Sequence, residues 1–268
     1  MKKNIFLLIS ALFIVSIKAQ KSFSSEYVAG YTLDYKNSNL PNAKSQLTTF
    51  ILMMNDRESY FKSMNVHVQD SLKYYKKIKE TGDALTDLKA FSKFACEYPE
   101  NIGTTVAKVY VTTPISRAFA SYEEPNIIEW KLVNEFKKIG NANCQKAFTN
   151  KYGRNWIAYF NPNIPLNYGP YKFNKLPGLI VELYDDKGDF HYKLYKFKKR
   201  KMICPFANSY ENVKHVKKEK AYQWRKDSFL QTDYSEVLDN ADSETIRQLN
   251  RNSRKLYDQY NPIELRLE

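Results

Sequence analysis

The sequence contains few of the residues that usually build catalytic sites. Its 268 residues include 8 glycines, 3 cysteines and 3 histidines, and the histidines (His67, His191 and His215) are far apart. There is no G-x-S-x-G turn, no H-E-x-x-H motif and no glycine-rich phosphate loop. We therefore expect no catalytic residues, no cofactor and no metal site. An enzyme of unknown class is the least favoured alternative, because sequence does not show which carboxylates meet in space.

The three cysteines are Cys96, Cys144 and Cys204. None belongs to a C-x-x-C motif, so a metal or redox role is not indicated. In an oxidising compartment any two of them can form a disulfide, which allows three pairings. Buried free thiols are an equally good interpretation.

Long apolar runs are missing except at the N-terminus. Lys2-Lys3 precedes an apolar run from Ile5 to Ile17, which ends before Lys18-Ala19. This order is typical of a secretory signal peptide, and the run is shorter than the roughly 20 residues that a spanning helix needs. We predict a signal peptide at residues 1–19 and export to the periplasm or the extracellular space. Residues 20–268 then form one domain with no transmembrane segment; an uncleaved anchor is the alternative.

Acidic residues are outnumbered, which gives a formal charge of +13. The lysines are spread along the chain, so we interpret most of them as solvated, and we expect no nucleic-acid partner for an exported protein. One compact basic run is the candidate for peripheral contact with an anionic membrane surface, although such runs more often protect a strand end. Its members are Lys198, Lys199, Arg200 and Lys201.

Aromatic residues are abundant, at 15% of the chain with 21 tyrosines, and many of them alternate with polar residues. This pattern predicts antiparallel strands such as Tyr27–Tyr35 and a hairpin of Ile180–Tyr184 with Phe190–Tyr195. Glu182 can pair across that hairpin with a lysine such as Lys193. The aspartates of the hairpin turn lack the ligand spacing of a calcium loop, so we assign them a turn-stabilising role. They are Asp185, Asp186 and Asp189.

Two stretches have a helical pattern. Apolar residues at mixed helical spacing predict a helical insertion near residues 64–95. A C-terminal helix is predicted from Asp242, a good N-cap residue, to Tyr260, where Asn261-Pro262 ends it. Residues 213–224 are compatible with a strand or a helix. The predicted fold class is mainly β (α+β): a curved antiparallel sheet, by analogy a half-barrel, with helical additions against its concave face.

The segment Asn161–Lys198 contains the densest turn signals, Gly169-Pro170 and Pro177-Gly178. It carries a resemblance to the GLPGLI family, a group of exported proteins found chiefly in Bacteroidota. The strand around Cys144, Trp156 and the closing Asn261–Leu265 also resemble the family pattern. The residues that match the family motif, with Lys175 in place of its first glycine, are Gly169, Pro170, Lys175, Leu176, Pro177, Gly178, Leu179 and Ile180.

The resemblance implies a location more clearly than an activity. The family has no agreed biochemical activity, and its members are associated with TonB-dependent transport systems of the outer membrane. We expect an envelope protein that binds an apolar ligand or a protein segment on its curved sheet. The alternative is an accessory subunit that docks on an outer-membrane transporter through its basic surface. A wide apolar cavity favours the first function, and a flat apolar patch rimmed by lysines favours the second.

Overall fold

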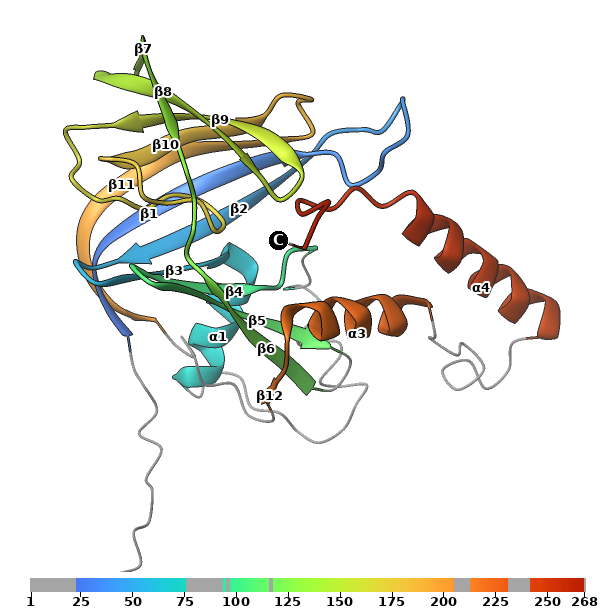
Figure 1. Ribbon diagram of the computed structural model, residues 1–268. Helices are drawn as coiled ribbons and strands as arrows, with labels where there is room; N and C mark the ends of the chain where they lie inside the picture. The colour runs from blue at the N-terminus through green and yellow to red at the C-terminus, as the bar shows by residue number, and fades with distance from the viewer. Residues whose placement is uncertain are drawn as a thin grey trace, which may run out of the picture.

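A computed structural model gives the fold of the chain (Figure 1). The predicted signal peptide, Cys96 and most of the insertion after Tyr75 lie outside the part that it describes. The described residues are 23–75, 94, 97–115, 118–204, 213–230 and 242–267.

Within the described residues, twelve strands form one curved, unclosed sheet (Figure 1). Their order is β12-β6-β5-β4-β3-β2-β1-β11-β10-β9-β8-β7, and every neighbouring pair is antiparallel except the parallel pair β12–β6. The predicted fold class is therefore confirmed. The strands are β1 (Phe23–Tyr35), β2 (Gln46–Met54), β3 (Glu58–Ser63), β4 (Asn101–Thr105), β5 (Lys108–Ile115), β6 (Ala118–Pro125), β7 (Lys131–Ile139), β8 (Ala142–Lys151), β9 (Arg154–Asn161), β10 (Leu179–Asp185), β11 (Phe190–Cys204) and β12 (Val213–His215).

The inner, concave face of the sheet carries the main hydrophobic core. Strand β1 lies at its centre, and Ala29, Tyr31 and Leu33 on alternate positions are fully buried. Tyr31 keeps its hydroxyl satisfied there by donating to the carbonyl oxygen of Ile180, 2.6 Å away. Trp156 of β9 is fully buried in the same cluster. The alternation of aromatic and polar residues that predicted strands thus also decides which face is buried.

A smaller cluster covers part of the outer face, where helix α1 (Met64–Tyr74) packs. The Ser63 hydroxyl caps this helix by accepting from the backbone N–H of Val66. A buried ion pair of Lys62 with Asp70, 2.8 Å apart, joins β3 to the helix. The helix predicted near residue 64 is confirmed over this range, but it lies against the convex face because its partners are outward-facing side chains.

Two further helices follow the sheet: α3 (Lys218–Leu230) and α4 (Ser243–Asp258). The stretch 213–224, which the sequence left open between a strand and a helix, contains one of each: the short strand β12 and the start of helix α3. Helix α3 contacts β5 and β6 and buries Ala221 in the main core. Helix α4 begins at the predicted cap, where the Asp242 carboxylate accepts from the N–H groups of residues 244 and 245. None of the residues of α4, all of them described, is buried.

Residues 161–178 form what we call the corner segment, which folds against the inner face between β9 and β10. Phe173 and Leu176 insert into the main core, and the ring centroid of Phe173 lies 4.7 Å from that of Trp156. The hairpin that follows is confirmed as β10 and β11. Strand β11 is longer than predicted and includes the basic run, because pairing with β1 continues to Cys204.

Within the described residues, no helix combines the length and the apolar character that crossing a membrane requires.

Candidate functional site

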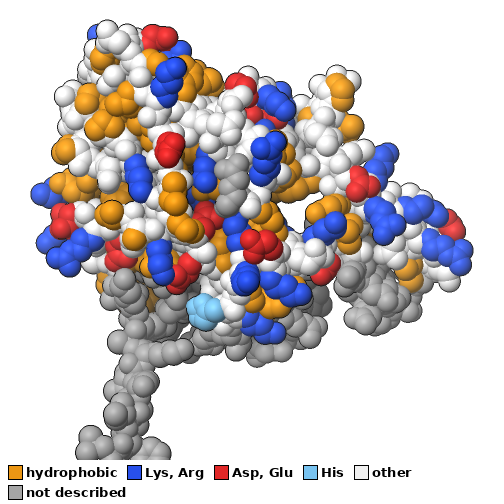
Figure 2. Space-filling model, in the orientation of Figure 1, with side chains coloured by type: hydrophobic (Ala, Val, Ile, Leu, Met, Phe, Trp, Pro, Cys, Tyr) orange, Lys and Arg blue, Asp and Glu red, His pale blue; other side chains and the backbone are white. Residues whose placement is uncertain are grey.

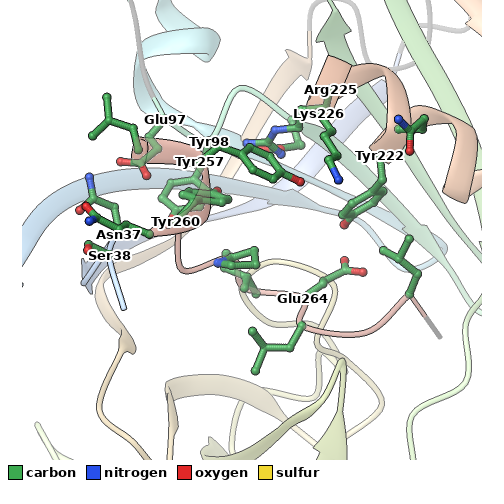
Figure 3. Close-up of a pocket in the computed structure, with 18 of the residues that line it drawn as sticks. Asn37, Ser38, Glu97, Tyr98, Tyr222, Arg225, Lys226, Tyr257, Tyr260 and Glu264 are labelled. Atoms are coloured by element: carbon green, nitrogen blue, oxygen red, sulfur yellow. The ribbon is translucent and has the colours of Figure 1, made fainter. Parts of the chain in front are cut away.

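A large open cavity lies on the inner side of the sheet and has a volume of about 880 Å³. This volume is within the roughly 300–1,000 Å³ that is usual for small-molecule sites. Its walls come from residues 97–100, helices α3 and α4, and the C-terminal segment 259–267. Figure 3 shows Glu97, Tyr98, Tyr257 and Tyr260 on one side, with Tyr222 and Arg225 opposite them. Segments that are far apart in sequence therefore build one site.

Tyrosines and aliphatic residues dominate the lining. Phenol rings combine a large apolar face with a polar tip, so they suit a ligand that is mainly apolar with a few polar atoms. Helix α4 contributes Leu256 and Tyr257. The aromatic and aliphatic lining residues are Tyr98, Tyr171, Tyr222, Leu256, Tyr257, Tyr260, Pro262, Ile263, Leu265 and Leu267.

The polar groups of the cavity are unevenly paired. Arg225 binds Glu100 at 2.5 Å, and Glu100 raises the pKa of that guanidinium above its usual value. Glu97 accepts a 3.0 Å hydrogen bond from the hydroxyl of Tyr35. The hydroxyl of Tyr98 is covered from solvent and has no hydrogen-bond partner among the described residues. Glu97 thus has only a neutral partner there, whereas Glu100 has a charged one.

Behind the C-terminal wall, four buried charges alternate in what we call the charge square: Lys172, Glu124, Lys218 and Glu264. Lys172 Nζ lies 2.9 Å from Glu124 and 2.5 Å from Glu264. Lys218 Nζ lies 2.7 Å and 2.9 Å from the same two carboxylates. Burial would raise the pKa of Glu264, but the two lysines hold it at about 2. The square joins β6, the corner segment, α3 and the C-terminal segment at one point.

Arg154 of β9 fastens the same C-terminal segment from another side. Its guanidinium binds the Asp185 carboxylate at 2.8 Å and donates to the Asn261 side chain at 2.5 Å. It also donates to the carbonyl oxygens of Pro262 and Ile263 at 2.8 Å and 3.1 Å. The cavity wall formed by this segment is thus held by directed, charge-assisted bonds.

The family-motif residues do not lie in the cavity wall. Gly169, Pro170 and the six residues from Lys175 to Ile180 belong to the corner segment and the start of β10. Asp185 has the predicted turn-stabilising role, since its carboxylate accepts from the N–H groups of Asp189 and Phe190. The motif region of the described structure is therefore a folding element beside the site.

Lys175 has a φ of 71°, in the left-handed region where glycine is the favoured residue. Its Nζ donates to the carbonyl oxygen of Asn126, which compensates for part of the strain. We expect Lys175→Gly to be more stable than Lys175→Ala by about 1 kcal/mol, because both lose that bond but only glycine relieves the backbone. Urea unfolding of both variants measures this difference. Equal midpoints would contradict the assignment of strain to this position.

The basic run lies on β11, away from the cavity lining. Lys198, Lys199, Arg200 and Lys201 are all exposed. Figure 2 shows basic side chains spread over several elements of the visible face, as the sequence predicted. The run is available to a partner, but it contributes nothing to the cavity.

The three histidines are in separate environments. His67 is buried on α1, and burial together with nearby Lys62 and Arg200 lowers its pKa to about 4. His191 Nε2 lies 2.9 Å from Glu182, and His215 Nδ1 lies 2.6 Å from the Ser121 hydroxyl. Among the residues that the structure describes, no three metal-binding side chains converge.

The Glu182 carboxylate does not bind Lys193, although the two residues are directly opposite in the hairpin. It binds His191 and also Lys137 of β7, at 2.6 Å. The hydrogen bond from His191 is the main reason that the pKa of Glu182 falls to about 2. The predicted pairing is wrong because a residue from a more distant strand lies closer than the residue opposite.

Two of the cysteines are described. Cys144 and Cys204 are both buried, and no disulfide joins them. The pairing between them is therefore excluded, and burial raises the pKa of both thiols.

The sequence signalled only part of the cavity. Helix α4, which contributes Leu256 and Tyr257 to the wall, was predicted as a helix from Asp242 to Tyr260. Glu97, Tyr98 and Arg225 were not selected, because isolated charged and aromatic residues outside a motif give no signal of the surface that they face.

No protein-family model matches the chain. No curated protein matches it either.

The fold does resemble solved structures. Two crystal forms of PNGF-II match with TM-scores of 0.55 and 0.54 at 13% and 14% sequence identity. These matches cover 76% and 78% of this chain, but only 33% and 34% of PNGF-II. An uncharacterized conserved protein from Thermus thermophilus matches with a TM-score of 0.36 at 10% identity, over 74% of this chain and 93% of that one. The chain spans about a third of the length of PNGF-II, and the likeness to PNGF-II concerns the fold alone.

Proposed function

We propose that this protein is an exported, non-enzymatic binding protein of the cell envelope that holds an apolar ligand in the cavity. The observation that carries the proposal is the cavity itself: about 880 Å³ of open space lined by five tyrosines. Placing an apolar body against these rings removes apolar surface from water, which contributes roughly 25 cal/mol per Å² buried.

The state of the charged groups supports binding over catalysis. Glu100 and Arg225 bind each other, and Glu264 belongs to the charge square. Groups held in such pairs are poorly placed to exchange protons with a substrate. The proposed role therefore needs only the shape and the apolar character of the site.

Export and family membership rest on the sequence. The basic, apolar and small-residue order of residues 1–19 supports a signal peptide, and the order of the motif residues supports membership of the GLPGLI family. A periplasmic or cell-surface location follows from both.

The test measures binding of a neutral, apolar fluorescent probe, N-phenyl-1-naphthylamine, to the chain without residues 1–19. We expect saturable binding that Leu256→Trp weakens several-fold, because Leu256 lines the cavity and a larger ring there occupies its space. Leu256 is 61% exposed, so the fold should tolerate the change.

The matched control is Leu47→Trp on β2, which is 71% exposed and does not line the cavity. This variant is expected to bind the probe like the unmodified protein. Absence of saturable binding, or an equal loss in both variants, would overturn the proposal.

A second candidate function is favoured by the edge strand β7. Leu132 and Phe136 are 47% and 50% exposed there, and the same strand carries three lysines, Lys131, Lys137 and Lys138. An edge strand can pair with a strand of another chain, and an apolar patch rimmed by lysines suits a protein interface. Docking on an outer-membrane transporter is the corresponding role. It uses a surface separate from the cavity.

A further inference from the structure

The carboxylates of the cavity differ in how their charge is balanced. Glu264 has two lysines of the charge square, and Glu100 has Arg225. Glu97, in contrast, binds only the neutral hydroxyl of Tyr35 among the described residues. Within the described part of the chain, this partly buried negative charge therefore has no basic partner. Partial burial makes such a charge a stronger attractor for a cation than it would be in water.

The tyrosines that neighbour Glu97 add to its attraction for a positively charged ligand. Tyr98 is nine-tenths buried and lines the cavity, and its covered hydroxyl has no hydrogen-bond partner within the part of the chain that the structure describes. Burial, and then Tyr260 and Glu97, raise the pKa of Tyr98. Burial raises the pKa of Tyr260 to about 12, with Arg225 acting against it and Glu100 and Glu97 adding to it. Both phenols therefore stay neutral, and they add ring faces and neutral oxygen atoms beside the charge of Glu97.

The ring faces can also attract a positive charge. A cation within about 6 Å of a tyrosine ring centroid gains roughly 0.5–2 kcal/mol from the ring quadrupole. The protein already has such a contact in the wall, where Lys226 Nζ lies 5.5 Å from the centroid of Tyr257. Lys226 is exposed, so solvent screens its repulsion of a cation at Glu97.

We infer that the ligand is a cationic amphiphile, with an ammonium group beside Glu97 and Tyr98 and an apolar body among the tyrosines and the aliphatic residues of α4. This inference rests on the proposed function, because it assigns a chemical class to the ligand of the same cavity. The formal charge of the chain is +13, so binding of a cation requires a local negative charge. Glu97, which has no basic partner among the described residues, provides it.

The experiment compares three probes with the same ten-carbon chain: decyltrimethylammonium, decyl glucoside and decanoate. Each probe competes with N-phenyl-1-naphthylamine for the chain without residues 1–19. All three probes are used below their own critical micellar concentrations. We expect the cation to act at about tenfold lower concentration than decanoate, which corresponds to about 1.4 kcal/mol. Decyl glucoside should lie between them.

Glu97→Gln removes the charge and keeps an acceptor for the Tyr35 hydroxyl. We expect it to abolish the preference for the cation and to leave the affinity for decyl glucoside within twofold. The control Glu219→Gln changes an exposed carboxylate of the same cavity and should keep the preference.

The outcomes separate the two proposals. Equal displacement by the three probes, tighter binding of decanoate, or a preference that survives Glu97→Gln would overturn the inference and leave the apolar-binding function standing. If the naphthylamine itself does not bind, the proposed function fails, and this inference with it. The comparison of probes on the unmodified protein tests the inference even where Glu97→Gln fails to fold.

Discussion

Lys172→Met is expected to lower the free energy of unfolding by about 3–5 kcal/mol, the loss typical of breaking a buried ion pair from one side. Lys172 is fully buried and lies between Glu124 and Glu264, and its Nζ also donates to the Tyr122 hydroxyl at 3.1 Å. Methionine fills a similar volume but leaves two buried carboxylates with one lysine. Equilibrium unfolding in urea, followed by circular dichroism, measures the loss.

The control is Lys108→Met, which removes one partner of an ion pair with Glu123. Both side chains of that pair are 53% exposed, so we expect a change of about 1 kcal/mol or less. If the two variants lose the same stability, the charge square does not hold the fold together as described.

The charge square also has a signature in the pH dependence of the same measurement. The folded-state pKa of Glu264 is about 2, below its ordinary value of 4.5, so its contribution is complete above about pH 4.5. Stability should fall as the pH drops from there towards 2, because protonation of Glu264 removes its attraction to Lys172 and Lys218. Lys172→Met should reduce this part of the acid sensitivity.

Gly178→Ala is expected to cost about 3 kcal/mol or more, at the upper end for overpacking. A Cβ at this position would lie 2.3 Å from the carbonyl oxygen of Asn161 and 2.8 Å from its carbonyl carbon. Both atoms are backbone, so neither can rotate away, and the corner segment would have to move out of the core. Thermal and urea unfolding measure the effect; failure of the variant to fold agrees with it.

Gly188→Ala measures the cost of the backbone conformation without the steric crowding that Gly178→Ala also causes. Gly188 has a φ of +67°, but a Cβ there would meet no atom within 4 Å. We expect it to cost about 1–2 kcal/mol, from the left-handed conformation alone. A loss at Gly178 no larger than the loss at Gly188 would mean that the corner segment adapts easily.

Features that depend on neighbouring residues were predictable from the sequence. Ile180–Tyr184 and Phe190–Tyr195 were expected to form a hairpin, and they pair as β10 and β11. Asp242 was expected to begin a helix, and it does. In each case the physical cause lies within a few residues, as a turn conformation or a cap that one side chain provides.

The charge square and the cavity were not predictable in the same way. A lysine or glutamate such as Lys172 or Glu264 is normally solvated, and nothing in the sequence indicates that these two meet 2.5 Å apart in the interior. The cavity wall likewise joins residues 97–100 to α3, α4 and the C-terminus. Residues that are far apart in sequence make up the cavity wall, whereas a sequence pattern reports only the periodicity of residues that are close together in the chain.

The position of β1 constrains the order in which the protein can assemble. This first strand lies in the middle of the sheet, and the Ser25 hydroxyl donates to the carbonyl oxygen of Met202, 177 residues later. Long-range antiparallel pairing of this kind forms slowly, because a large loop must close first. During synthesis from the N-terminus, the central strand would therefore stay half-paired until β11 arrives. The C-terminal segment, bound by Arg154 and the charge square, would then complete the fold and the cavity in the same step.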